Sequence, residues 1–256
     1  MTNELENGYV RSGLEKGVAT IEFFHPRGNS LPAAILTELA VAIRHAGENA
    51  DARLILLRST GDKTFCAGAS FDELAAINNE AEGLAFFSGF AHVINAIRKA
   101  PKFVIARIQG RCVGGGVGLA AAADYAIATE TAEVKLSELA VGIGPFVVGP
   151  AVERKIGKAA FSHLAIDATM WRSADWARRK GLYSEVHGHI DAVDEAVEKL
   201  CTTLAASSSE AMQEMKRIFW EGTENWDQLL IDRAAISGRL VLSTFTREAI
   251  ARFKAK

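Results

Sequence analysis

The strongest constraint on the fold is a repeated order of apolar strand, turn and helix in the first 150 residues. A β-branched and aromatic run at 17–24 precedes a turn and then the helical apolar spacing of 32–46. Apolar runs at 53–59 and 102–110 follow the same rule, and a long helical segment near 80–98 separates them. Because continuous apolar strands that alternate with helices imply a sheet covered on both faces, the sequence predicts an α/β fold of stacked strand-helix units.

The repeat is most compact at 110–144, where strand, glycine-rich turn, small-residue helix and strand follow within about 35 residues. From about residue 150 the composition changes to helical segments, with one further strand predicted at 182–188. We therefore expect a core at 1–190 for binding and catalysis and a helical region at 191–256. The polar stretch 207–209 predicts a helix break within that second region.

Composition and charge exclude several classes of protein. The 29 basic and 31 acidic residues nearly balance and are scattered, which predicts no nucleic-acid partner. Three cysteines without metal-ligand spacing predict no metal site and fit a reducing compartment. The first twenty residues lack a signal-peptide pattern, and no stretch holds 18 uninterrupted apolar residues, so we expect a cytoplasmic protein without a membrane partner.

Two glycine-containing turns are candidates for backbone chemistry. The run Gly114–Gly116 opens a predicted helix directly after a strand, where glycines let a substrate carbonyl approach backbone N–H groups. The turn at 65–71 also joins a strand to a helix start, with Ser70 as the expected N-cap. Either turn alone is as well explained by packing, but together they would offer two N–H donors if the fold brings them together.

Glu138 is the candidate acid/base group. It is the only acid in the segment 134–142, and the sequence stays largely apolar as far as Gly149. A carboxyl group beside an apolar wall has a raised pKa, which suits proton transfer near neutral pH. The alternative is a Glu that faces solvent on an alternating strand.

Three motifs together resemble the crotonase (enoyl-CoA hydratase/isomerase) superfamily over nearly the whole chain. The segment 65–70, FCAGAS, resembles the family's F-[SCA]-A-G-A-D turn. Gly110 to Gly116 matches G-x-x-x-G-G-G, and Ser137-Glu138 to Gly142 resembles P-E-x-x-x-G, with Ser in place of Pro. The start HPRGNSLP and the end TREAIARFKAK also resemble the family's terminal patterns.

The resemblance implies a spiral of ββα units with a helical C-terminal trimerisation region, assembled as a homotrimer or hexamer. It implies an acyl-CoA substrate whose thioester oxygen lies between the N–H groups of Ala69 and Gly115, with Glu138 as the acid/base group. Coenzyme A is then part of the substrate, and no cofactor is bound permanently. The resemblance places coenzyme A contacts at Arg27, Ala67, Phe253 and Lys256, the last reaching a neighbouring subunit's ligand.

Departures from the family pattern bear on the reaction. Family hydratases carry a second glutamate two residues after the glycine triplet, where this chain has Gly118. One carboxyl group fits double-bond isomerisation or hydration of an enoyl-CoA; decarboxylation or carbon-carbon cleavage is an alternative, and so is a paralogue that binds acyl-CoA without catalysis. Asp72 stands where many relatives have a coenzyme-facing Lys, and the bulky run 146–148 predicts a reshaped pocket for a short, branched or functionalised acyl group.

Overall fold

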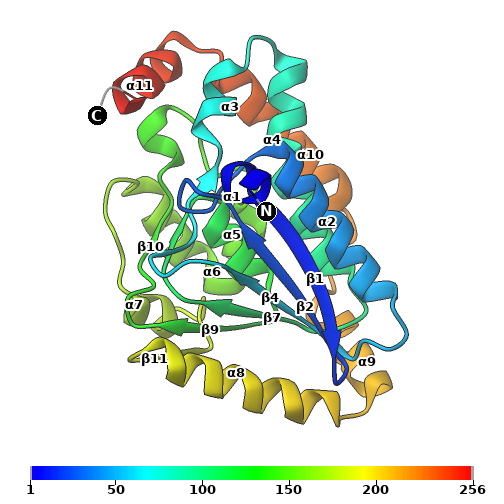
Figure 1. The fold of residues 1–256 in the computed structure, drawn as a ribbon. Coiled ribbons are helices and arrows are strands. Elements are labelled where there is room, and N and C mark those ends of the chain that lie inside the picture. Colours follow the sequence, from blue (N-terminus) through cyan, green and yellow to red (C-terminus); the bar gives the residue numbers. More distant parts are fainter. Residues whose placement is uncertain (1, 255–256) are drawn as a thin grey trace.

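The computed structural model describes residues 2–254, and its largest element is a six-stranded sheet (Figure 1). The strands lie in the order β1 (Tyr9–Glu15), β2 (Val18–Phe24), β4 (Leu54–Ser59), β7 (Val104–Ile108), β9 (Tyr125–Thr129) and β11 (Glu185–His187). Strand β1 is antiparallel to β2, and each later neighbour in the sheet is parallel to the one before. The runs predicted at 17–24, 53–59 and 102–110 form β2, β4 and β7, as expected.

Short strands make a second layer. Strands β5 (Thr64–Cys66), β8 (Arg111–Val113) and β10 (Val134–Lys135) form one parallel sheet, and β3 (Ser30–Leu31) pairs with β6 (Gly68–Ala69). Each of β2, β4, β7 and β9 is therefore followed by a strand of the second layer and then by helical structure. This order is the predicted spiral of ββα units.

Helices occupy the rest of the described chain. They are α1 (Thr2–Asn7), α2 (Ala33–Glu48), α3 (Phe71–Ala76), α4 (Glu80–Lys99), α5 (Gly115–Ala122), a short 3-10 helix η1 (Glu138–Val141), α6 (Gly149–Ile166), α7 (Ala174–Arg179), α8 (Ile190–Ala205), α9 (Ser209–Phe219), α10 (Trp226–Leu240) and α11 (Thr244–Lys254). The predicted caps and breaks are confirmed: the Ser70 hydroxyl accepts the Glu73 N–H at the start of α3, and Ser208 caps α9 after α8 has ended.

The central strands of the main sheet are buried on both faces, as their apolar sequences predict, whereas the edge strand β1 is largely exposed. Ile55 and Leu57 belong to the large core that includes residues of α2, α4 and α5. Leu54 of β4 and Ile105 of β7 pack in a separate cluster with Val193 of α8. Figure 1 shows α8 lying along one side of the sheet and α2 on the other. Because successive side chains of a strand point to opposite faces, neighbouring residues of one strand serve two different cores.

Helices α4 and α10 touch at a pair of glycines. A Cβ atom on Gly83 would lie 2.6 Å from the Cα of Gly238, and a Cβ atom on Gly238 would lie 2.7 Å from the amide nitrogen of Leu84. Such distances leave room for hydrogen only, so the two helix backbones are in direct contact. This contact joins the C-terminal helices to the N-terminal half of the chain.

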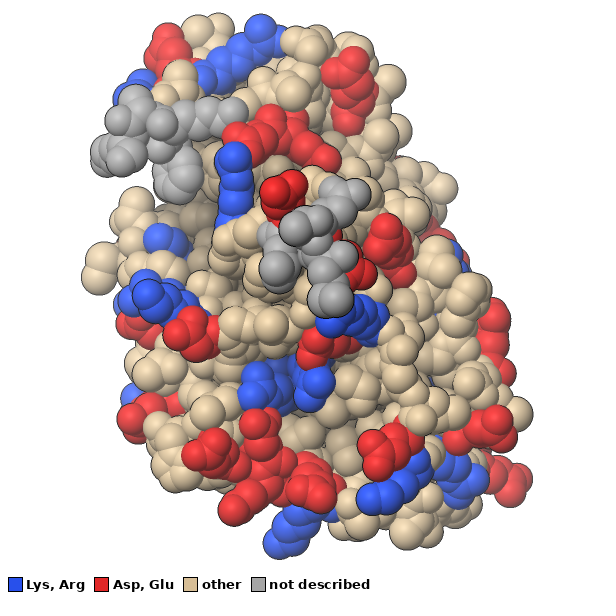
Figure 2. Space-filling view, viewed as in Figure 1, with Lys and Arg blue, Asp and Glu red and all other residues tan. Residues whose placement is uncertain are grey.

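Charges are mixed over the face seen in Figure 2, where acidic and basic side chains are interspersed. None of the helices within 2–254 has the length and apolar character needed to span a bilayer.

Candidate active site

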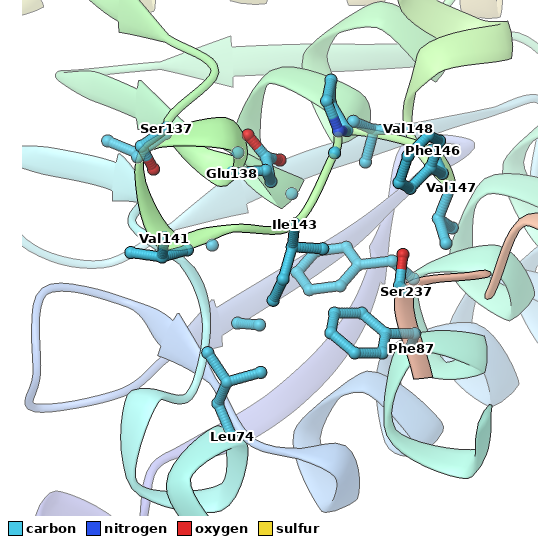
Figure 3. A pocket seen from close by; sticks show the side chains of 18 of the residues that line it. Leu74, Phe87, Ser137, Glu138, Val141, Ile143, Phe146, Val147, Val148 and Ser237 are labelled. Carbon is cyan, nitrogen blue, oxygen red and sulfur yellow. The ribbon is translucent and has the colours of Figure 1, made fainter. Parts of the chain in front are cut away.

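A pocket with about 660 Å³ of empty space, part of it open to solvent, lies where several spiral units meet (Figure 3). The two glycine turns form one wall, and η1 with the loop after it forms another. Helices α3, α4 and α10 close the remaining sides with Leu74, Phe87, Phe90 and Ser237. Strand ends, a helix start and two distant helices thus meet around one mainly apolar space.

The structure brings the two glycine turns together. Gly68 adopts a φ of 90°, which an L side chain rarely permits, and a Cβ atom placed on it would lie 3.1 Å from the carbonyl oxygen of Val113 and 3.5 Å from the amide nitrogen of Gly115. Both turns line the pocket. The convergence that the sequence left open is therefore present.

The two residues predicted to offer N–H donors, Ala69 and Gly115, lie at this junction. Gly115 is the first residue of α5, so its N–H has no acceptor within the helix. On the other turn the N–H groups of Ala67 and Ser70 donate to the Asn29 and Leu31 carbonyls, and Ala69 lies between these two anchored residues. Ala69 and Gly115 both line the pocket, as expected for the predicted donors.

Glu138 begins η1 and lines the same pocket. The residue as a whole is half-buried, but its carboxylate Oε2 is buried and has no hydrogen-bond partner among the described residues. Desolvation raises the pKa of Glu138 to about 7, and a hydrogen bond from its own backbone opposes this shift only in part. Its placement in a 3-10 helix, with the carboxylate turned inward, rules out the alternative of a solvent-facing Glu on a strand.

Gly114 leaves room for the Glu138 carboxylate beside the start of α5. Its φ is 51°, and a Cβ atom on it would lie 2.9 Å from Glu138 Oε1. The first glycine of the triplet is thus needed both for its backbone conformation and for the close approach of the acid.

No second acid lines the pocket among the residues that the structure describes. Glu138 is the one titratable side chain among the residues of 2–254 that line it. At the position of the family's other glutamate, a Cβ atom on Gly118 would lie 2.5 Å from Val148 Cγ1. The replacement of the family's second glutamate by Gly118 is therefore accompanied by close packing of Val148 at that position.

Bulky residues shape the far side of the pocket. Phe146, Val147 and Val148 line it, as the sequence predicted for this run. Figure 3 shows them on a different side of the space from Leu74 and Val141. The helix residues Phe87, Phe90 and Ser237 were not predicted, because their local sequences show only the spacing of packed helices.

Comparison with known proteins decides the family. The enoyl-CoA hydratase/isomerase family model matches residues 13–254. The chain is a member of the enoyl-CoA hydratase/isomerase family. YngF of Bacillus subtilis (strain 168), whose name places it among the enoyl-CoA hydratase/isomerases, is 31% identical over 199 residues, which span 77% of this chain and 75% of YngF.

Two further relatives show the breadth of the family. The crystal structure of enoyl-CoA hydratase from Bacillus halodurans superposes with a TM-score of 0.87 at 22% identity, covering 95% of this chain and 99% of that chain; it shows the shared fold. The (7aS)-7a-methyl-1,5-dioxo-2,3,5,6,7,7a-hexahydro-1H-indene-carboxyl-CoA hydrolase of Mycobacterium tuberculosis (strain ATCC 25618 / H37Rv) is 26% identical over 207 residues, or 79% of this chain and 80% of that protein.

The four residues predicted to contact coenzyme A lie in different surroundings in this family member. Ala67 lines the pocket, and its N–H donates to the Asn29 carbonyl. Arg27 is exposed and forms an ion pair with Asp72 at the start of α3. The side chain of Phe253 and the whole of Lys256 lie outside the residues that the structure describes.

Other candidate chemistry at the family's site is not supported. Cys66 precedes the first turn but is fully buried, and burial raises the pKa of its thiol to about 12, which keeps it protonated. No cluster of three His, Cys, Asp or Glu residues suited to a metal ion occurs in the described part of the chain.

Proposed function

We propose that this protein is an enoyl-CoA isomerase that moves a double bond along the acyl chain by transferring one proton. The observation that carries the proposal is Glu138: a single carboxyl group with a pKa of about 7, facing an apolar pocket beside two glycine turns. A base with this pKa is half ionised near neutral pH, where it both accepts and returns a proton efficiently.

The thioester oxygen would accept hydrogen bonds from the N–H groups of Ala69 and Gly115. Negative charge grows on this oxygen when a proton leaves the adjacent carbon, and fixed donors stabilise that charge without reorganisation. The N-terminus of α5 adds a favourable dipole at the same place. In other enzymes each such donor accounts for about 10²- to 10³-fold in rate.

The reaction then has two proton transfers. The Glu138 carboxylate removes a proton from C2 of a 3-enoyl thioester, and the electron pair of that C–H bond is delocalised onto the thioester oxygen as a dienolate. The protonated Glu138 delivers the same proton to C4, and the electrons return to form the C2–C3 double bond. No other reactant is consumed.

Isomerisation is preferred to hydration because hydration adds a water whose positioning and deprotonation are served best by two acid/base groups. The described lining of this pocket has one such group, Glu138, and Val148 fills the space beside Gly118 where a second would have to lie.

The test is to incubate the purified protein with a 3-enoyl-CoA and, separately, with crotonyl-CoA, following absorbance of the conjugated enoyl thioester. The proposal expects absorbance to rise with the 3-enoyl-CoA and to stay constant with crotonyl-CoA. Loss of absorbance from crotonyl-CoA would make the protein a hydratase, and silence with both substrates would leave thioester binding without this catalysis.

A second candidate is hydrolysis of a keto-bearing carboxyl-CoA. It is favoured by the Mycobacterium tuberculosis relative, whose named substrate carries two oxo groups. An enolate-stabilising pair of donors and one acid/base group would serve that reaction as well. Mass analysis of the products would reveal added water and a ring or chain cleavage.

The remaining parts of the proposal concern coenzyme A and assembly. Arg27, Ala67 and, from beyond the described side chains, Phe253 and Lys256 would hold coenzyme A in a cytoplasmic homotrimer or hexamer. Exposed apolar side chains such as Ile166 and Met170 support an assembly. Light scattering coupled to size exclusion would measure its mass.

A further inference from the structure

Ser237 is a polar residue in an otherwise apolar part of the pocket. It lies on α10, is 1% exposed and lines the pocket. Among the described lining residues, polar side chains outside the pair Ser137 and Glu138 are limited to Ser237. Figure 3 shows Ser237 and Glu138 on different sides of the space, so an acyl chain whose reacting carbons lay at Glu138 could extend toward Ser237.

The Ser237 hydroxyl has only a marginal partner. Its Oγ lies 3.5 Å from the carbonyl oxygen of Arg233, well beyond the usual 2.5–3.0 Å of an O–H···O hydrogen bond. Ser88 on α4 provides the contrast: it is also buried, at 7% exposed, but its Oγ lies 2.7 Å from the Leu84 carbonyl oxygen. Helical serines normally satisfy their hydroxyl in the way that Ser88 does. A buried hydroxyl without a good partner is costly, so Ser237 is poised to donate elsewhere.

The glycine contact between α4 and α10 fixes this position. Gly238 follows Ser237 and touches Gly83, so the α10 backbone cannot move closer to α4. Phe87, one turn after Gly83 on α4, lines the pocket next to Ser237 in Figure 3. The hydroxyl is therefore held on a rigid wall.

We propose that Ser237 selects acyl groups that carry a neutral oxygen acceptor, specifically a ketone, beyond the reacting carbons. The inference rests on the proposed binding of acyl-CoA in this pocket. A ketone oxygen can accept the hydrogen bond that the Ser237 hydroxyl makes only at 3.5 Å to the Arg233 carbonyl oxygen. It also fits an apolar pocket because it carries no charge. A carboxylate does not fit, since none of the described lining residues is Lys, Arg or His and its charge would be buried without a counter-ion.

The test uses saturated thioesters, which bind without undergoing the proposed reaction. Dissociation constants of 4-oxopentanoyl-, 5-oxohexanoyl- and 6-oxoheptanoyl-CoA are measured by calorimetry against partners in which a methyl group replaces the ketone oxygen, with butyryl- and glutaryl-CoA as further probes. At least one ketone should bind about 3- to 10-fold more tightly than its methyl partner, the range expected for one hydrogen bond. Glutaryl-CoA should bind more weakly than the ketone thioester and its methyl partner.

Two variants assign the effect. Ser237→Ala should bring the ketone-to-methyl affinity ratio to about one, whereas Ser88→Ala, which removes another buried hydroxyl outside the pocket, should leave the ratio unchanged. No ketone preference in the native protein, or a preference that survives Ser237→Ala, would overturn the inference.

Turnover of a 3-enoyl-CoA by the same preparation separates the two proposals. Turnover without ketone preference overturns the role of Ser237 alone, and ketone preference without turnover overturns the isomerase alone. If butyryl-CoA and every other thioester fail to bind, both proposals fall.

Discussion

Val148 fills the space beside Gly118, because a Cβ atom on Gly118 would lie 2.5 Å from Val148 Cγ1 and 2.8 Å from Val148 Cβ. The two residues belong to helix α5 and to the cap of helix α6, which pack together. Where family hydratases have a second glutamate, this chain therefore has Gly118 with the Val148 side chain packed against it.

This contact predicts a coupled effect on stability. Gly118→Ala should lower the free energy of unfolding by about 1–3 kcal/mol through overpacking. In a Val148→Gly background both close atoms are gone, so the same substitution should cost at least about 1 kcal/mol less. The coupling is measured by urea unfolding of the native protein, the two single variants and the double variant, all at the same protein concentration. An equal loss of unfolding free energy in both backgrounds would show that the Val148 side chain moves aside without strain and does not couple to position 118.

Replacing Glu138 by Gln should reduce kcat on a 3-enoyl-CoA by at least about 10²-fold, because the proton carrier is lost while its shape is retained. Thioester binding should change little. Glu133→Gln is the control, since Glu133 pairs with Arg111 outside the pocket and its variant should keep full activity. Undiminished turnover by Glu138→Gln would remove this residue from the mechanism.

The pH dependence of kcat/KM should report the same group. Glu138 must be ionised to remove a proton, and burial raises its pKa to about 7. Below that pH, kcat/KM should fall about tenfold for each pH unit, and above it kcat/KM should level off. A profile that is flat from pH 5 to pH 8 would contradict the assignment.

Stability should depend on pH through Glu138 in the opposite direction. The folded state keeps the proton up to a pKa of about 7, whereas the unfolded state releases it near the ordinary value of 4.5. The unfolded state therefore binds fewer protons between these values, and the free energy of unfolding falls as pH rises, by up to about 3 kcal/mol. Comparison of Glu138→Gln with the native protein should show the variant gaining in relative stability from pH 4.5 to pH 8. A constant difference over this range would exclude the raised pKa.

A buried ion pair predicts a further contrast. Lys216 Nζ lies 2.5 Å from Asp124 Oδ2, and the two side chains are 3% and 7% exposed. Lys216→Met would leave the carboxylate without its cation and should cost about 3–5 kcal/mol. Lys158→Met breaks an exposed pair with Glu153 and should cost less than about 1 kcal/mol. Thermal unfolding of both variants provides the comparison, and similar midpoints would refute it.

The sequence predicted the parts of the fold that local pattern determines. Apolar runs located β2, β4 and β7, Ser70 marked a helix start and 207–209 marked a helix break, because burial and capping act over a few residues. Glu138 stood out because no other acid shares its segment. Motif resemblance, and not periodicity, supplied the roles expected of Ala69 and Gly115.

Features that depend on distant contacts were not predictable in this way. The approach of Gly68 to Gly115 joins two strand-to-helix turns, and nothing in either turn specifies its distance from the other. Glu138 was considered on a strand, but the carboxylate is turned inward by a short 3-10 helix. Ser237 gave no signal, because a serine on a helix is ordinary until a pocket is known to lie beside it.

The contact between Gly83 and Gly238 has a consequence for the order of folding. Phe87 and Ser237 line the same pocket but are 150 positions apart in the chain. During synthesis the strands and α4 emerge long before α10, so a nascent chain can assemble its sheet while the distal wall of the acyl pocket is still missing. The pocket is therefore complete only when α10 docks on α4, with Gly238 against Gly83.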